Sequence, residues 1–175
     1  YAHDRALLDS SVREDILSWA GLASDRKSIR ELFPRSSESS FRPLLSGGKA
    51  EVWNTCWSGP LLWVQAPRAK WGAAVQKILV DQAKGIAVIP VDKTKSWFWA
   101  LGEVAVDWWD LPHHVPIFSD AEGWRYPQQK GLTTRVVLFD AFGNEQGDDK
   151  PTEAWDDVQP GEQPGGGGYQ SRVKV

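Results

Sequence analysis

The residues best placed for chemistry lie in two short loops, each of which follows an apolar run. The first loop is Gln65-Ala-Pro-Arg68, after Leu61–Val64, and the second is Pro90-Val-Asp-Lys-Thr94, after the run that begins at Gly85. In α/β sheets, ligands bind at the carboxyl ends of the strands. An amide, a guanidinium and the carboxylate of Asp92 would meet there, although a turn or helix cap is the commoner role for such an acid. The sequence therefore predicts that any ligand site lies between these two loops.

Other residues with chemical potential give weaker signals. His113 and His114 are adjacent in a proline-flanked loop, where solvent exposure is commoner than metal binding. Cys56 is the only cysteine, which excludes an internal disulfide, and we expect a buried, reduced thiol. Asp107 and Asp110 fit a solvated helix end. No phosphate-binding, dinucleotide-binding, nucleophile-elbow or metal motif is present, so we assign no catalytic residue and expect no metal.

The elements that would position the loops form a strand–helix–strand unit. Leu61–Val64 is bounded by Gly59-Pro60 and by Pro67, which favours a short buried parallel strand. The next segment repeats apolar residues with helical spacing, and Gly85 would end that helix. Gly85–Pro90 is rich in β-branched residues and predicts a second buried strand. The crossover should be right-handed. The helical stripe consists of Trp71, Ala74, Val75, Ile78, Leu79 and Gln82.

A second, aromatic helix is predicted after this unit. Thr94 is its expected N-cap, and the helical stripe of Trp97, Phe98 and Leu101 continues toward Pro112. Gly102 would be a close packing point within that helix. Thr134–Asp140 is a strong strand signal. We expect it to form a hairpin with Val115–Phe118 through the loop 123–131.

The ends of the chain differ from its centre. Ser10–Ala20, with Ser10 as cap and Gly21 as stop, and Ser24–Phe33, stopped by Pro34, predict two short helices. Residues 50–57 could form a strand or a turn. From Gly143 the chain is acidic and rich in Gly and Pro, which indicates a disordered or draped tail that Trp155 and Tyr169 could pin to a surface. We therefore predict one α/β, Rossmann-like three-layer domain (1–142) with a mixed, mainly parallel sheet, a helical segment (1–49) packed on it, and a tail (143–175).

Composition narrows the functional classes. The 175 residues carry a net charge of −3, which gives no electrostatic case for nucleic-acid binding. No apolar run is long enough for a transmembrane segment. The absence of methionine indicates a processed mature protein, a piece of a polyprotein or a trimmed chain. The chain has 11 tryptophans, a residue type enriched at interfaces, and Trp97-Phe-Trp99 and Trp108-Trp109 cannot place every ring on one helix face. Our interface candidates are Trp99, Trp108, Trp109, Trp124 and Trp155.

The order of segments from Pro60 to Asp140 resembles the adenine-N6 DNA methyltransferase-like (Dam-like) domains of retroelement polyproteins. In that family the strand ends in Asn-Pro-Pro and an aromatic residue. The amide and the first proline carbonyl bind the amine of a flipped adenine, on which the aromatic ring stacks. In this sequence Gln65, Ala66, Pro67 and Arg68 stand at those positions, and Trp97 would wall the base.

The motif departs from the family pattern. Gln65 is one methylene longer than asparagine, and Arg68 would not close the pocket as an aromatic ring does. Asn54-Thr-Cys-Trp57 is an alternative register that lacks both prolines and a preceding strand. No glycine-rich cofactor loop is recognisable upstream, and Gly21-Leu-Ala-Ser24 is a poor substitute.

The resemblance implies two main functions. The first is a non-catalytic binding or structural subunit of a larger assembly, with other protein subunits as partners and no cofactor. The alternative is an S-adenosylmethionine-dependent DNA adenine-N6 methyltransferase with a divergent site, whose cofactor would be S-adenosylmethionine and whose partner would be DNA. A polyprotein fragment without an independent role is a third reading. An intracellular location is expected, with import into an organelle as one option.

Overall fold

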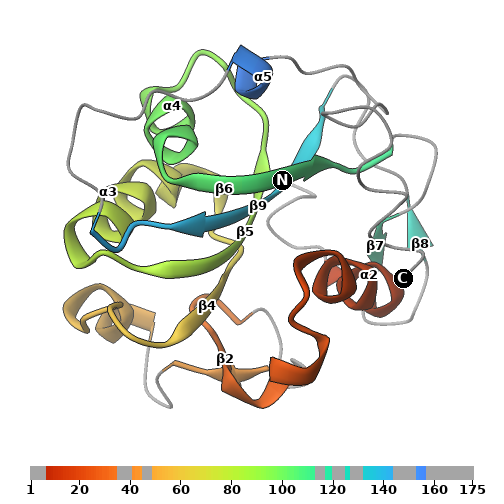
Figure 1. The fold of residues 1–175 in the computed structure, drawn as a ribbon, viewed down its shortest axis with the longest axis horizontal. Helices are drawn as coiled ribbons and strands as arrows, with labels where there is room; N and C mark the ends of the chain where they lie inside the picture. The colour runs from red at the N-terminus through yellow and green to blue at the C-terminus, as the bar shows by residue number, and fades with distance from the viewer. Residues whose placement is uncertain are drawn as a thin grey trace.

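A six-stranded mixed sheet is the main feature of the chain (Figure 1). The computed structural model describes residues 7–34, 41–44, 49–112, 117–119, 125–126, 132–143 and 153–156. The sheet order is β3-β2-β4-β5-β9-β6, in which β3, β2, β4 and β5 are parallel neighbours and β9 is antiparallel to both β5 and β6. The predicted α/β class with a mixed sheet agrees with this arrangement. The strands are β2 Ile29–Glu31, β3 Arg42–Pro43, β4 Leu61–Val64, β5 Lys84–Pro90, β6 Ala105–Asp110 and β9 Thr134–Asp140.

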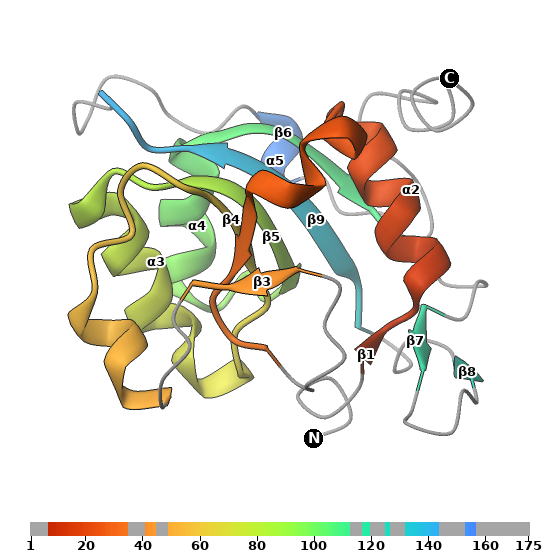
Figure 2. The ribbon, with the colours of Figure 1, turned by 90° about the horizontal axis from the view of Figure 1, so that it is seen from below.

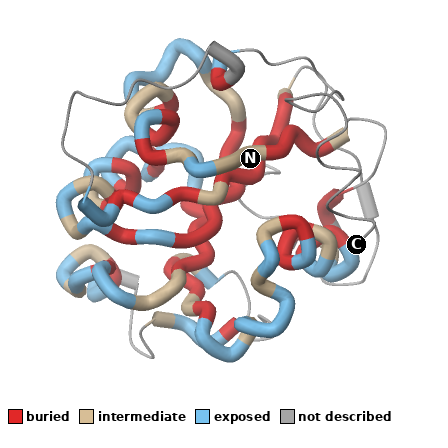
Figure 3. Tube along the Cα trace, in the orientation of Figure 1, coloured by how far each residue is buried: buried red, intermediate tan, exposed pale blue. Residues whose placement is uncertain are grey.

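Helices cover both faces of this sheet (Figure 2). α3 (Trp71–Asp81) and α4 (Ser96–Glu103) lie on one face, and α2 (Ser10–Ala20) lies on the other. Strand β5 shows why both faces need cover: Ala87 and Ile89 belong to the core under α3 and α4, whereas Ile86 and Val88 belong to the core under α2. A strand buried on both faces reads as a continuous apolar run. Figure 3 shows this buried centre.

The remaining elements are short. A small second sheet has the order β1-β7-β8. Its strands are β1 Leu7–Leu8, β7 Phe118–Ser119 and β8 Arg125–Tyr126, and the short helices are η1 Ala23–Ser28, η2 Lys49–Asn54, η3 Arg68–Lys70 and α5 Glu153–Asp156. Within the described ranges, no helix combines the length and apolarity that a membrane span requires.

The predicted strand–helix–strand unit is confirmed as β4–α3–β5, but the role assigned to Gly85 was wrong. The helix ends at Gln82, which adopts a left-handed conformation (φ 54°) and donates its N–H to the carbonyls of Ile78 and Leu79. Gly85 lies inside β5 (φ 155°), where a Cβ would overlap with the backbone of Leu62 on the neighbouring strand. Glycine is therefore needed here for the close approach of two strands.

The predicted aromatic helix is too long. α4 ends at Glu103, and the chain continues as strand β6 beside β9. A strand places successive side chains on opposite faces. Trp108 accordingly packs on the α3/α4 side and Trp109 on the α2 side, an arrangement that a single helix face could not provide. Thr94 is not the N-cap, because its N–H and hydroxyl both donate to the carboxylate of Asp92.

Three further predictions near the ends need correction. α2 has the predicted bounds and ends at Gly21, but Asp9 is its N-cap instead of Ser10. The helix expected over residues 24–33 is replaced by η1 and the inner strand β2, because sheet pairing overrides the local helical pattern. Thr134–Asp140 is a strand as predicted. It lies between β5 and β6, while Phe118 pairs with Leu8 and Tyr126, so the expected hairpin is absent.

Cys56 is exposed, contrary to the expected buried thiol, since it follows the short helix η2 at the surface. Residues 50–54 belong to the 3-10 helix η2 and residues 55–57 form no strand, so the strand alternative is wrong. Of the predicted tail, only residues 143 and 153–156 are described. His113, His114, Trp124 and Tyr169 lie outside the described residues.

Candidate functional site at the carboxyl edge of the sheet

The topology points to one place for a ligand. Starting from β2, the chain adds β3 on one side of that strand, and then β4 and β5 on the other side. The strand order therefore reverses between β2 and β4. In open α/β sheets a ligand crevice forms at such a switch point, outside the carboxyl ends of the strands. Here the last residue pair of the two strands is Glu31 and Trp63.

Side chains of the chain itself occupy the α2 side of this switch point. The ring of Phe41 is buried and lies 5.0 Å from the ring of Trp63, centroid to centroid. The guanidinium carbon of Arg13, from α2, lies 5.4 Å from the Phe41 ring and 5.7 Å from the Trp63 ring. These are cation–π distances. The two rings and the guanidinium form a packed cluster where a crevice would otherwise open.

The charge of Arg13 has a partner within this cluster. Burial is the largest influence and lowers the pKa of Arg13, while the carboxylate of Glu31 acts in the opposite direction by stabilising the charge. Both side chains are buried. A guanidinium stays protonated at neutral pH even when its pKa falls. The switch point thus holds a cation and an anion that belong to the protein, which leaves little electrostatic demand for a charged ligand.

The loop after β4 combines buried and exposed residues. Gln65 and Ala66 are buried, whereas Pro67 and Arg68 are exposed. Pro67 leads into η3, where its carbonyl accepts a hydrogen bond of 2.8 Å from the N–H of Lys70. The Nη2 atom of Arg68 lies 4.0 Å from Oδ2 of Asp92. The structure thus brings the two loops together as predicted, through an exposed ion pair that contributes at most about 1 kcal/mol.

Asp92 acts as a turn residue. Its Oδ1 atom accepts hydrogen bonds from the N–H of Thr94 at 3.0 Å and from the hydroxyl of Thr94 at 2.5 Å. The hydroxyl contact is the main reason that the pKa of Asp92 lies below its ordinary value. The acid is therefore ionised and held by its own loop, which is the common role for aspartate in a turn.

Trp97 packs between the two helices on one face of the sheet. Its ring stacks on the buried ring of Trp71, the first residue of α3, with centroids 5.6 Å apart and planes 24° apart. The rings of Trp97 and Phe98 meet edge-on, with centroids 6.3 Å apart. Trp97 thus joins α4 to α3. The structure places it in helix packing, and the wall of a base pocket predicted from the resemblance remains a prediction.

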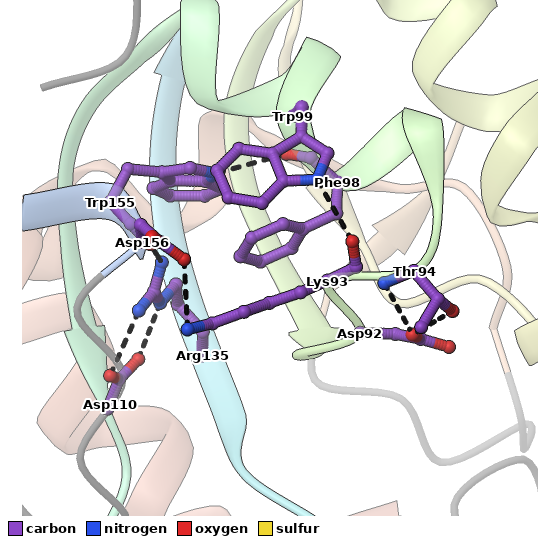
Figure 4. A network of polar contacts seen from close by, with 9 residues as sticks. All are labelled: Asp92, Lys93, Thr94, Phe98, Trp99, Asp110, Arg135, Trp155 and Asp156. Carbon is purple, nitrogen blue, oxygen red and sulfur yellow. Dashed lines mark hydrogen bonds and ion pairs between the residues drawn. The ribbon is translucent and has the colours of Figure 1, made fainter. Parts of the chain in front are cut away.

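A buried ion pair lies at the same edge of the sheet (Figure 4). Arg135, near the start of β9, pairs in register with Asp110 at the end of β6, and both side chains are 0% exposed. The Nε of Arg135 donates to Oδ1 of Asp110 at 2.6 Å, and its Nη2 donates to Oδ2 at 3.1 Å. The solvated position predicted for Asp110 is therefore wrong, because β6 carries this residue inward. Sequence analysis gave no role to Arg135, although a charged residue within an apolar strand signals a buried partner.

The third guanidinium nitrogen of Arg135 binds Trp155, which belongs to the short helix α5. Nη1 of Arg135 donates to the carbonyl oxygen of Trp155 at 2.7 Å. The indole N–H of Trp155 donates to the carbonyl of Phe98 at 3.1 Å, and its ring stacks on Phe98 with a centroid distance of 4.9 Å. The ring of Trp108 meets it edge-on at 5.2 Å. Trp155 is fully buried by these contacts.

The predicted interface tryptophans differ in how far they are buried. Trp109 and Trp155 are buried inside the chain, so in this structure neither ring is available to a partner. Trp99 and Trp108 are partly exposed. The indole N–H of Trp99 donates to the carbonyl of Lys93 at 3.0 Å, which ties α4 to the loop after β5. Trp124 lies outside the described residues.

Comparisons with protein-family models, curated proteins and solved structures gave no match for this chain. The resemblance described above therefore rests on the residues alone. Within the described part of the chain, no group of three or more His, Cys, Asp or Glu side chains is arranged to hold a metal ion.

Proposed function

We propose that this chain is a non-catalytic binding subunit of a larger protein assembly, built on a methyltransferase-like α/β domain. The packed cluster of Arg13, Phe41 and Trp63 at the switch point carries the proposal, because it fills the place where an α/β enzyme of this kind would bind its cofactor. A protein whose ligand crevice is occupied by its own side chains is suited to binding through other surfaces.

The loop after β4 supports the same conclusion. An enzyme that acts on a flipped base needs a shaped pocket that stacks the base and hydrogen-bonds its edge. Here Gln65 and Ala66 are buried, and Arg68 points toward Asp92 on the next loop. The position that would stack on a base thus belongs to an exposed ion pair. Among the described residues, the geometry offers structural roles for this loop.

The opposite edge of the sheet offers a surface for a protein partner. Val80, Val106 and Phe142 are 72%, 62% and 76% exposed. Ala141 donates its N–H to the carbonyl of Ala83, which joins the chain after β9, where Phe142 lies, to the end of α3, where Val80 lies. Val106 lies at the start of β6, at the same end of the sheet. Exposed apolar groups at one edge are typical of contact surfaces, whereas scattered ones are ordinary.

Calorimetric titration with S-adenosylmethionine and S-adenosylhomocysteine tests the proposal. We expect no heat of binding from the native chain. We also expect none from a variant with Gln65→Asn, Ala66→Pro and Arg68→Phe, since restoring the loop does not displace Arg13 from the switch point. Micromolar binding by the native chain would overturn the proposal and favour the methyltransferase alternative. DNA methylation gained by the restored variant would do the same.

The partner itself is tested on protein from its source. We expect the chain to co-fractionate with other protein subunits in native size-exclusion chromatography. Migration as a free monomer would contradict a role in an assembly, whatever the calorimetric result.

A further inference from the structure

The residues around Trp155, among them Phe98, Gly102 and Trp108, form a slot that fits an indole ring. Its walls come from α4, β6 and β9, and the residue that fills it comes from α5. A Cβ atom at Gly102 would lie 2.5 Å from Nε1 of Trp155 and 2.7 Å from its Cδ1. Any other residue at position 102 would therefore collide with the ring. The ring also stacks on the ring of Phe98 and meets the ring of Trp108 edge-on.

The slot contacts three chemical features of its occupant (Figure 4). The carbonyl of Phe98 accepts the indole N–H at 3.1 Å, and Nη1 of Arg135 donates to the carbonyl of the same tryptophan at 2.7 Å. Nζ of Lys93 lies 2.9 Å from Oδ1 of Asp156, the next residue. The slot thus recognises an aromatic side chain, the backbone at that residue and a following carboxylate.

The slot keeps its charge balance when the occupant leaves. Two nitrogens of Arg135 are bound to Asp110, while the third donates to the carbonyl of Trp155 and the guanidinium carbon lies 4.5 Å from the centroid of its ring. A buried cation that already has its anion does not require the occupant for neutrality. The occupant belongs to a four-residue helix and joins the domain body through residues 144–152. In the sequence it is therefore a short segment tethered to the slot that it fills.

We propose that this slot is a docking site for an aromatic–acidic peptide segment, a tryptophan followed by an aspartate. Trp155 and Asp156 fill it in cis, and a segment of the same chemistry from a partner subunit fills it in trans. The partner's part in this rests on the proposed function. A short tether gives the cis segment a millimolar effective concentration, so the trans segment gains the slot when the tail is drawn away.

Docking also affects the candidate site. Lys93 belongs to the loop after β5, and its carbonyl accepts the indole N–H of Trp99. The same residue contacts the carboxylate of the occupant through Nζ. A change of occupant therefore alters the contacts of the loop that carries Asp92.

The test uses the full chain with Trp155→Ala and a fluorescein-labelled peptide that covers residues 150–161. Fluorescence anisotropy is expected to show saturable binding to W155A, at least tenfold tighter than binding to the native chain. A peptide with alanine in place of its tryptophan should bind at least tenfold more weakly. The double variant W155A/G102V, whose slot is closed, is the matched control and should not bind.

A folded W155A chain that ignores the peptide would overturn the proposal, as would equal binding to W155A/G102V. If W155A is unfolded alone, saturating peptide should restore its thermal transition, and failure to restore it would also overturn the proposal. A native dimer that W155A abolishes would identify a second copy as the trans occupant and refute a separate partner segment. Binding of S-adenosylmethionine would leave the slot intact, so the two proposals fail independently.

Discussion

Replacing Asp110 by asparagine would leave the guanidinium of Arg135 buried without its counter-charge. Both side chains are 0% exposed, and two hydrogen bonds, of 2.6 Å and 3.1 Å, join them. Removing one partner of a buried ion pair costs about 3–5 kcal/mol. Asparagine keeps the shape of the side chain and one acceptor, so we expect the lower end, about 3 kcal/mol. That is a large share of the 5–15 kcal/mol that stabilises a typical domain.

The exposed pair between Lys93 and Asp156 is the matched control. Its side chains are 46% and 61% exposed, and it lies in the same network. An exposed pair of this kind contributes about 0–1 kcal/mol. Asp156→Asn should therefore change the free energy of unfolding by less than about 1 kcal/mol, although it removes the same charge as Asp110→Asn.

Urea unfolding measures both variants. With a slope of about 1–3 kcal/mol/M for a small protein, a loss of 3 kcal/mol lowers the midpoint by about 1–3 M. The double variant D110L/R135M, which removes both charges, should recover part of the loss because no buried charge remains. A midpoint for D110N no lower than that for D156N would refute the reasoning that burial gives this pair its importance.

Two further perturbations test local features. Burial raises the pKa of Asp81, but the hydrogen bonds from Lys77 and the N–H of Trp57 outweigh it, so the pKa lies below 3.8 in the folded state. The stability that this gives is present above the ordinary pKa and is lost as the pH falls through the folded pKa. A pH series of urea midpoints should show a shallower acid decline for Asp81→Asn, and parallel curves would contradict this. Gly85→Ala should cost at least about 2 kcal/mol, because its Cβ would overlap with the backbone of Leu62. Gly72→Ala, in α3, would place its Cβ at an ordinary contact distance of 4.0 Å from Cδ1 of Trp97, so it should raise the urea midpoint slightly, and equal effects of the two changes would argue against the overlap.

Local pattern was enough to predict the centre of the sheet. β4, β5 and β9 are apolar runs bounded by glycine, proline or polar residues, and α3 repeats its apolar residues over three turns. In these segments the local preference agrees with the environment that the fold provides, since parallel strands covered on both faces must be apolar throughout.

The segment 96–110 shows where local pattern fails. Its aromatic residues fit the apolar stripe of a helix up to Leu101 and fit a strand after Val104. The helix predicted from the first half was wrongly extended through the second half. Pairing with β9 decides the second half, because alternation buries Trp109 on the α2 side and turns Asp110 toward Arg135. That partner lies 25 residues further along the chain. A stretch of sequence short enough to reveal a helical repeat does not reach as far as this partner.

The sequence predicted that the loops after β4 and β5 lie together, but it did not predict which residues pack beside them. The two loops meet where parallel strands must end together, and the contact between Arg68 and Asp92 agrees with this. The residues that fill the site come from elsewhere: Arg13 lies on α2, and Trp155 lies on α5. Their contacts depend on the packing of whole elements against the sheet. The inward-facing charge of Arg135 left a trace in the sequence, and Trp155 was predicted as an aromatic residue that could pin the tail to a surface.

The two side chains that pack at the carboxyl edge, Arg13 and Trp155, come from opposite faces of the sheet. Arg13 packs on Trp63 from the α2 side, and Trp155 packs on Phe98 from the α4 side. Each adds buried contacts at an edge that an enzyme must keep open and strained, and such open sites cost stability. The ion pair of Arg68 with Asp92 and the burial of Gln65 give the loop after β4 structural contacts of its own, so this loop and the packing on both faces together stabilise the carboxyl edge.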